Sequence, residues 1–210
     1  MTRSAQPPRH FSMIRGFQPA DFFTLGNAAC GVASVLLAMQ FLVSGEAVHF
    51  FWAAAMAPLA GAFDVADGRV ARARHQHSAL GRELDSLADI VSFGVGPAAL
   101  GFAVGLRGGW DALVMVYFVC CGVSRLARYN VTAETLSAGA DKVAYFEGTP
   151  IPTSILITGV LAAIAAFSGL GASLPGGVWT IGPWQLHPLV VLFALSGTLM
   201  ISKTLRIPKF

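Results

Sequence analysis

Apolar side chains occupy long stretches of this chain instead of alternating with polar ones at the period of a surface helix or strand. A helix that crosses the hydrocarbon core of a bilayer needs about 20 predominantly apolar residues. Six stretches meet this requirement, and we expect each of them to form a membrane-spanning helix. They cover residues 23–43, 48–68, 81–106, 111–130, 150–169 and 186–203.

The segment before the first apolar stretch has a different pattern. Residues 10–23 mix phenylalanine, methionine and isoleucine with Arg15 and Asp21, which is typical of a helix that lies along a membrane surface. We therefore predict an N-terminal tail and interfacial amphipathic segment over residues 1–22, followed by one six-helix bundle over residues 23–210. The expected fold class is an all-α membrane protein with six transmembrane helices and an N-terminal amphipathic surface helix.

The composition indicates a chain whose main solvent is lipid. Hydrophobic residues make up 55% of the 210 residues and charged residues only 12%, and the mean hydropathy is +0.64. A soluble domain carries about 25% charged residues. The three cysteines stand inside apolar stretches without the CxxC spacing of a metal site, so we interpret them as small hydrophobic side chains.

The basic residues predict an orientation in the membrane. If the N-terminus is cytoplasmic, six spans return the C-terminus to the cytoplasm, and every lysine and arginine except Arg107 lies on that side. Cytoplasmic connections of membrane proteins carry such an excess of positive charge. We therefore expect an integral protein of a bacterial or archaeal-type cytoplasmic membrane, with both termini and the functional site in the cytoplasm and no nucleic-acid partner.

Four aspartates stand at the facing ends of the second and third spans. Asp64 and Asp67 are three residues apart, and Asp85 and Asp89 are four apart, so each pair occupies one helix face. Because the two spans are antiparallel neighbours, both pairs can converge on one site. Carboxylates gathered at the edge of a low-dielectric slab repel one another strongly. Divalent cations resolve that repulsion, and hard oxygen ligands suit Mg²⁺ or Mn²⁺, with room for two ions.

Two other interpretations of the aspartates stay open at this point. The carboxylates can be ordinary interfacial groups paired with Arg69, Arg72, Arg74 or Arg82, or they can carry the ion of a divalent-metal transporter. A transporter is expected to place its carboxylates near the membrane midplane in broken helices. Clustering at one membrane face beside Arg72, with small residues between the carboxylates, favours catalysis, since intramembrane ionisable clusters are functional by default.

The spacing Asp-x2-Asp-Gly-x2-Ala-Arg-x8-Gly-x3-Asp-x3-Asp resembles the motif of the CDP-alcohol phosphotransferase family. The motif is complete here, in Asp64, Asp67, Gly68, Ala71, Arg72, Gly81, Asp85 and Asp89. Flanking stretches over residues 84–94, 124–130 and 146–152 look most like the phosphatidylserine synthases of the integral-membrane type within that family. Thr149 is a small departure, because leucine is usual at that position.

The resemblance implies a metal-dependent transfer of a phosphatidyl group from CDP-diacylglycerol to L-serine, giving phosphatidylserine and CMP. It implies that Asp89 is the catalytic base and that the metal ligands are Asp64, Asp67, Asp85 and Asp89. It also implies a homodimer. The residues expected to bind the CDP-lipid are Asp64, Asp67, Gly68, Ala71, Arg72, Gly81 and Asp85, together with Asn27 of the first span, whose amide can alternatively bridge helices.

Two arginines at the cytoplasmic end of the fourth span are candidates for binding the acceptor. Arg125 and Arg128 are three residues apart on one helix face, and we expect one or both to meet the acceptor carboxylate or the lipid phosphate. Anchoring at the headgroup level is the alternative. The same chemistry with glycerol 3-phosphate, inositol phosphate or choline stays open, although a phosphorylated acceptor would need more basic residues than these.

Overall fold

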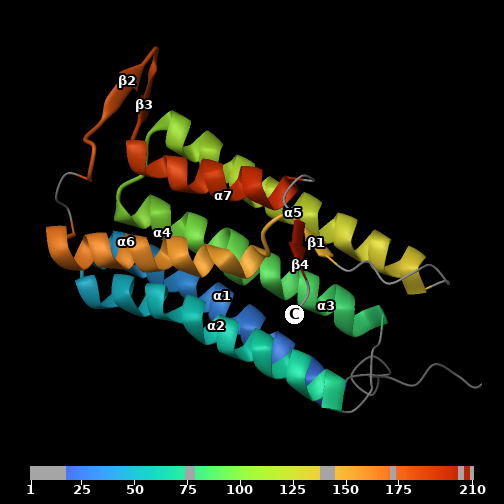
Figure 1. The fold of residues 1–210 in the computed structure, drawn as a ribbon. Coiled ribbons are helices and arrows are strands. Elements are labelled where there is room, and N and C mark those ends of the chain that lie inside the picture. Colours follow the sequence, from blue (N-terminus) through green and yellow to red (C-terminus); the bar gives the residue numbers. More distant parts are fainter. Residues whose placement is uncertain (1–17, 74–78, 138–144, 171–173, 203–205, 209–210) are drawn as a thin grey trace, which may run out of the picture.

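The computed structural model describes residues 18–73, 79–137, 145–170, 174–202 and 206–208 (Figure 1). It is predominantly helical, which confirms the expected all-α class, whereas the count of six membrane-spanning helices stays a prediction. Within these residues, the helices long and apolar enough to cross a membrane are Pro19–Ser44, Ala47–Ala73, Leu80–Val104, Gly109–Val131 and Ile151–Ser168. The sixth expected span is a shorter apolar helix, Pro188–Ile201. The expected amphipathic segment falls mainly on residues 1–17, outside the described residues.

The first two helices form an antiparallel pair that packs together along its length (Figure 1). Helix α1 (Pro19–Ser44) begins earlier than expected, because Asp21 caps it by accepting a hydrogen bond from the Gln18 backbone N–H at 2.7 Å. Gly45 ends α1 with a φ of 72°, which glycine adopts without strain. Helix α2 (Ala47–Ala73) then returns along α1.

The third span is continuous but not uniformly α-helical. It consists of α3 (Ala79–Asp89), a π-helical segment η2 (Ile90–Val95) and α4 (Gly96–Val104). Hydroxyl groups hold η2 in place, because Ser92 donates to the Asn27 backbone carbonyl at 2.7 Å and Ser154 donates to that of Phe93 at 2.6 Å. A Cβ atom at Gly31 would lie 2.7 Å from the Ser92 Cα atom, so only glycine permits this close approach of α1 to η2.

The remaining helices complete the bundle around the third span. Helix α5 (Gly109–Ser137) packs against α7 (Val191–Ile201), where the rings of Phe118 and Phe193 meet edge to face at 5.3 Å. Helix α6 (Ile155–Ser168) packs against α4 and follows the short 3-10 helix η3 (Ile151–Ser154). The prolines at 150 and 152 therefore mark a helix start, as proline does in a first turn.

The structure also contains two short antiparallel strand pairs, neither of which the sequence analysis predicted. Strand β2 (Trp179–Ile181) pairs with β3 (Trp184–Leu186), and the 3-10 helix η4 (Pro188–Val190) then leads into α7. Strand β1 (Tyr145–Glu147) pairs with the C-terminal strand β4 (Arg206–Pro208). The two pairs lie toward different ends of the bundle (Figure 1).

Candidate active site

The aspartates of the sequence motif come together between α2 and α3. One carboxylate oxygen from each of Asp64, Asp67 and Asp85 lies within 4.8 Å of the others. Asp89 stands one turn beyond Asp85, and its carboxylate interacts electrostatically with the other three. Asp67 and Asp89 are buried, whereas Asp64 and Asp85 are half-buried. The structure thus gathers all four carboxylates at one site, as the helical spacing predicted.

Helix α1 supplies a third wall of this site and orients two of the carboxylates. The Thr24 hydroxyl donates a hydrogen bond to Asp67 Oδ2 at 2.9 Å, and the Asn27 Nδ2 group donates to Asp89 Oδ1 at 3.0 Å. Thr24 and Asn27 are three residues apart, so one helix face presents both donors. Sequence reasoning missed Thr24. It could have been predicted from the sequence, because Thr24 and Asn27 are polar residues three positions apart inside an apolar span.

Asn27 bridges helices, which was one of its two expected roles. The residue is fully buried, and its backbone carbonyl also accepts the hydrogen bond from Ser92 on the π-helical segment. These contacts join α1 to the third span at Asp89 and at Ser92, three residues further along. The Asn27 Oδ1 atom is buried without a hydrogen-bond partner among the described residues. The Asn27 amide therefore orients the Asp89 carboxylate through its Nδ2 group, and its Oδ1 atom is available to accept a further hydrogen bond.

The donor set fits hard divalent cations. Among the described residues, none of the four carboxylates forms an ion pair with Arg69 or Arg72. Asp85 Oδ1 is buried and lacks a hydrogen-bond partner there. A buried carboxylate oxygen without a partner is costly, and Mg²⁺ and Mn²⁺ prefer such oxygen ligands. The alternative of interfacial pairing thus finds no support at Arg69 or Arg72, and Arg74 lies outside the described residues.

The other motif residues surround the carboxylates on the same two helices. Gly68 and Ala71 lie on α2 and Gly81 lies on α3, all half-buried. A Cβ atom at Gly68 would lie 3.5 Å from Nη1 of Arg72, so the Arg72 guanidinium group folds back over Gly68. Arg72 is exposed, and its charge is therefore available beside the carboxylates.

The two acceptor candidates lie on α5, which faces α3. Arg125 is half-buried and interacts electrostatically with Asp89 and Arg128. Its Nε atom is buried without a hydrogen-bond partner among the described residues. Arg128 is also half-buried. Arg125 therefore presents a buried donor close to Asp89.

A polar network that sequence reasoning did not identify fixes α5 against α3. The buried Asn130 amide donates to Glu83 Oε1 at 3.2 Å and to the Ser86 hydroxyl oxygen at 3.0 Å. Ser86 follows Asp85 directly in the chain, and Asn130 lies two residues beyond Arg128 and five beyond Arg125 on α5. The network therefore sets the register between the aspartates and those arginines.

Comparison with known proteins gives the family. The family model described as CDP-alcohol phosphatidyltransferase matches residues 17–199. A CDP-diacylglycerol–serine O-phosphatidyltransferase of Saccharomyces cerevisiae is 39% identical over 208 residues, which are 95% of this chain and 74% of that protein. A protein of the same name from Mycobacterium bovis is 38% identical over 66% of this chain, which spans about half (49%) of that relative's length.

An archaetidylserine synthase of Methanothermobacter thermautotrophicus is 33% identical over 155 residues, covering 70% of this chain and 60% of that protein. The region matched by the family model, residues 17–199, includes the complete aspartate motif and all the apolar helices except the last two residues of Pro188–Ile201. The chain is an integral membrane protein that belongs to the CDP-alcohol phosphatidyltransferase family.

Proposed function

We propose that this chain transfers a phosphatidyl group from CDP-diacylglycerol to L-serine and releases CMP. The observation that carries the proposal is the convergence of the complete aspartate motif in a chain that is 39% identical, over 95% of its length, to a CDP-diacylglycerol–serine O-phosphatidyltransferase. A second relative is named archaetidylserine synthase. The distribution of the lysines and arginines predicts that the site faces the cytoplasm, so CMP leaves on that side. The homodimer implied by the family resemblance is part of the same proposal.

The four aspartates would hold two Mg²⁺ or Mn²⁺ ions, which neutralise the CDP diphosphate and stabilise charge on the attacking and leaving oxygens. Gly68, Ala71 and Gly81 leave the space beside the carboxylates free for the nucleotide. Arg72, folded over Gly68, meets a phosphate oxygen of the donor. This assignment rests on the carboxylate geometry and on the small side chains of α2 and α3.

Asp89 acts as the base for the acceptor hydroxyl. A serine hydroxyl is a weak nucleophile at neutral pH, so a carboxylate that takes its proton lowers the barrier. The hydroxyl oxygen forms a bond to the phosphorus of the phosphatidyl group, the bond from that phosphorus to CMP breaks, and the proton passes to Asp89. The hydrogen bond from Asn27 to Asp89 Oδ1 holds the carboxylate in one orientation and leaves Oδ2 for the proton. The attack is direct, without a covalent enzyme intermediate.

The proposal is tested by the release of CMP from CDP-diacylglycerol. Purified protein receives Mg²⁺ or Mn²⁺ and one acceptor at a time: serine, glycerol 3-phosphate, inositol phosphate or choline. Metal-dependent release with serine alone supports the proposal. Release with a different acceptor keeps the chemistry and rejects serine, and no release from folded protein with any acceptor rejects the transferase function.

Because Asn27 hydrogen-bonds to Asp89, we expect its substitution to slow catalysis even without any contact between Asn27 and the substrate. Asn27→Leu should lower kcat about ten- to a hundred-fold, because outer partners that orient functional carboxylates have effects of that size. Binding of CDP-lipid should change much less. Ser34→Ala is the matched control, since Ser34 lies on the same helix and donates to the Ala53 carbonyl, away from the site. A normal kcat in Asn27→Leu would remove its positioning role.

The acceptor arginines predict a change in KM. Arg125→Ala and Arg128→Ala should each raise the KM for serine about ten-fold if both side chains bind its carboxylate, because charge-assisted hydrogen bonds to carboxylates are among the stronger ones. Arg107→Ala is the control, as Arg107 lies at the other end of the bundle. An unchanged KM in both variants would assign the pair to membrane anchoring.

A further inference from the structure

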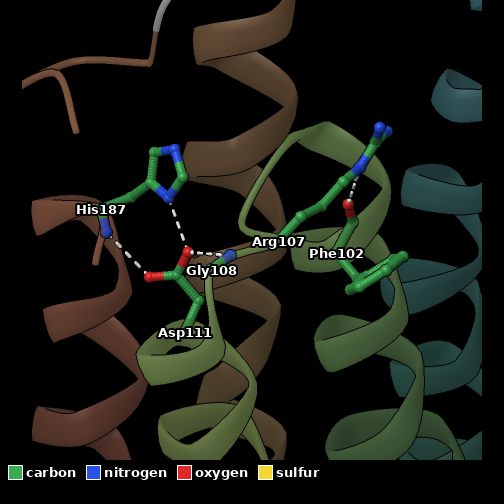
Figure 2. A network of polar contacts seen from close by, with 5 residues as sticks. All are labelled: Phe102, Arg107, Gly108, Asp111 and His187. Atoms are coloured by element: carbon green, nitrogen blue, oxygen red, sulfur yellow. Dashed lines mark hydrogen bonds and ion pairs between the residues drawn. The ribbon is translucent and has the colours of Figure 1, made fainter. Parts of the chain in front are cut away.

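A buried polar network joins Asp111 to Gly108 and His187 (Figure 2). It lies at the first turn of α5, at the end of the bundle that does not carry the aspartates. Asp111, in the first turn of α5, is fully buried. Its Oδ2 atom accepts hydrogen bonds from the Gly108 backbone N–H at 2.8 Å and from His187 Nδ1 at 2.6 Å. Its Oδ1 atom accepts one from the His187 backbone N–H at 2.8 Å. Because His187 directly follows β3, the network ties the β2–β3 hairpin to the start of α5.

Aromatic packing reinforces the same attachment. The Trp110 indole N–H donates to the Ile181 carbonyl at 3.0 Å, and the rings of Trp110 and Trp184 meet edge to face at 5.3 Å. A Cβ atom at Gly109 would lie 2.6 Å from the Trp184 ring, so glycine at this position lets the hairpin rest on α5. The hairpin is therefore a fixed part of the bundle.

The strand register gives the hairpin two different faces. Trp179 pairs with Leu186 and Ile181 pairs with Trp184, while Thr180 pairs with Gln185. Side chains alternate between the two faces of a strand, and directly opposed residues share a face. One face therefore carries two tryptophans, an isoleucine and a leucine, and the other carries a threonine and a glutamine.

The apolar face is largely uncovered within the described residues. The exposed fractions are 59% for Trp179, 46% for Ile181 and 44% for Trp184. No aspartate, glutamate, lysine or arginine occurs between residues 148 and 202. The nearby Arg107 donates a hydrogen bond to the Phe102 carbonyl near the end of α4 (Figure 2). It donates another to the Ala103 carbonyl. An uncharged surface with clustered tryptophans is what the border between headgroups and hydrocarbon selects.

The position of the hairpin relative to the membrane-spanning helices indicates that lipid contacts its apolar face. Figure 1 shows β2 and β3 projecting from the ends of α5 and α7, across the helix axes and beyond the perimeter of the bundle. The helices beneath it span the membrane, so the space beside them at this depth holds lipid. We propose that the β2–β3 hairpin binds the lipid surface of the leaflet opposite the aspartate cluster, with Trp179, Ile181 and Trp184 among the headgroups and Thr180 and Gln185 toward water. The proposal depends on the membrane span and not on the acceptor of the reaction.

Neighbouring positions on one strand provide the test. In a background with Cys30, Cys120 and Cys121 replaced by alanine, Trp179→Cys and Thr180→Cys each receive an environment-sensitive fluorophore in the full-length protein. The protein is placed in vesicles of phosphatidylcholine and phosphatidylglycerol. At position 179 we expect blue-shifted emission and quenching by nitroxide-bearing lipid several-fold stronger than at position 180, with iodide showing the reverse preference. Equal quenching by iodide at both positions would overturn the proposal.

A second measurement uses protein without a label on the hairpin. It distinguishes burial of the hairpin by lipid from burial by a second copy of the chain. Bromine-bearing lipid should quench the tryptophan emission of the unmodified protein, and Trp179→Phe should remove part of the quenchable emission. Both effects should persist when the protein is diluted with excess lipid. If protection of position 179 disappears on dilution, the hairpin binds another copy of the protein and the lipid proposal is wrong.

Discussion

Replacing Asp89 with asparagine should lower kcat by about 100- to 10,000-fold, the range that general-base catalysis contributes. The amide cannot take the proton from the acceptor hydroxyl, so attack on the phosphorus would begin from the neutral alcohol. The amide oxygen can still accept the hydrogen bond that Asn27 now donates to Asp89 Oδ1. The fold of the site is therefore retained, and most of the affinity for CDP-lipid with it. CMP release gives kcat, and calorimetry gives the affinity for CDP-lipid.

Glu83→Gln is the matched control for this experiment. Glu83 is an exposed carboxylate on the same helix, and it accepts its hydrogen bond from Asn130 instead of facing the cluster. Its neutral counterpart should leave kcat near that of the unmodified enzyme. Turnover of Asp89→Asn at the normal rate would eliminate Asp89 as the base and direct attention to another carboxylate of the cluster.

The convergence of the aspartates was predictable because helical periodicity alone brings it about. Two residues three or four apart share a face, and a short connection forces the facing ends of two spans together. In the structure, the face of the third span that carries Asp89 continues against α1, since Ser92 contacts α1 at Gly31 and a Cβ at Gly96 would lie 3.6 Å from the Ser34 hydroxyl.

The partners of the aspartates were harder to identify from sequence. Thr24 and Asn27 are single polar residues in an apolar span, and such residues bridge helices as often as they bind ligands. Their target depends on the rotation of α1 against the third span, which the close approach at Gly31 sets. The π-helical turn after Asp89 leaves no mark in the hydrophobic pattern, because a six-residue segment is too short to change the period. Such turns are frequent at functional sites, and here the turn presents Ser92 to α1.

The strands were missed for a related reason. Each has three residues, too few for an alternating pattern to stand out from the surrounding glycine, proline and tryptophan. The last apolar stretch was consequently drawn too long: the sequence predicted a span over 186–203, whereas the helical part is Pro188–Ile201. Residue 186 instead pairs with Trp179 in the hairpin that lies at the membrane surface in our proposal.

Replacing Asp64 with asparagine should weaken metal-dependent binding of the nucleotide by at least about ten-fold, since even outer partners of metal ligands have effects of that size. Asp64 is one of three carboxylates whose oxygens lie within 4.8 Å of one another. Losing one negative charge and one oxygen ligand lowers the affinity of the cluster for Mn²⁺, which paramagnetic resonance measures directly without turnover. Calorimetry with CDP in Mg²⁺ should show a parallel loss, while in a chelator both proteins should bind CDP equally weakly.

Glu83→Gln, which removes a carboxylate outside the cluster, should retain Mn²⁺. An unchanged CDP affinity in Mg²⁺ would instead show that Asp64 is not a metal ligand, and the cluster would then hold its cations through Asp67, Asp85 and Asp89.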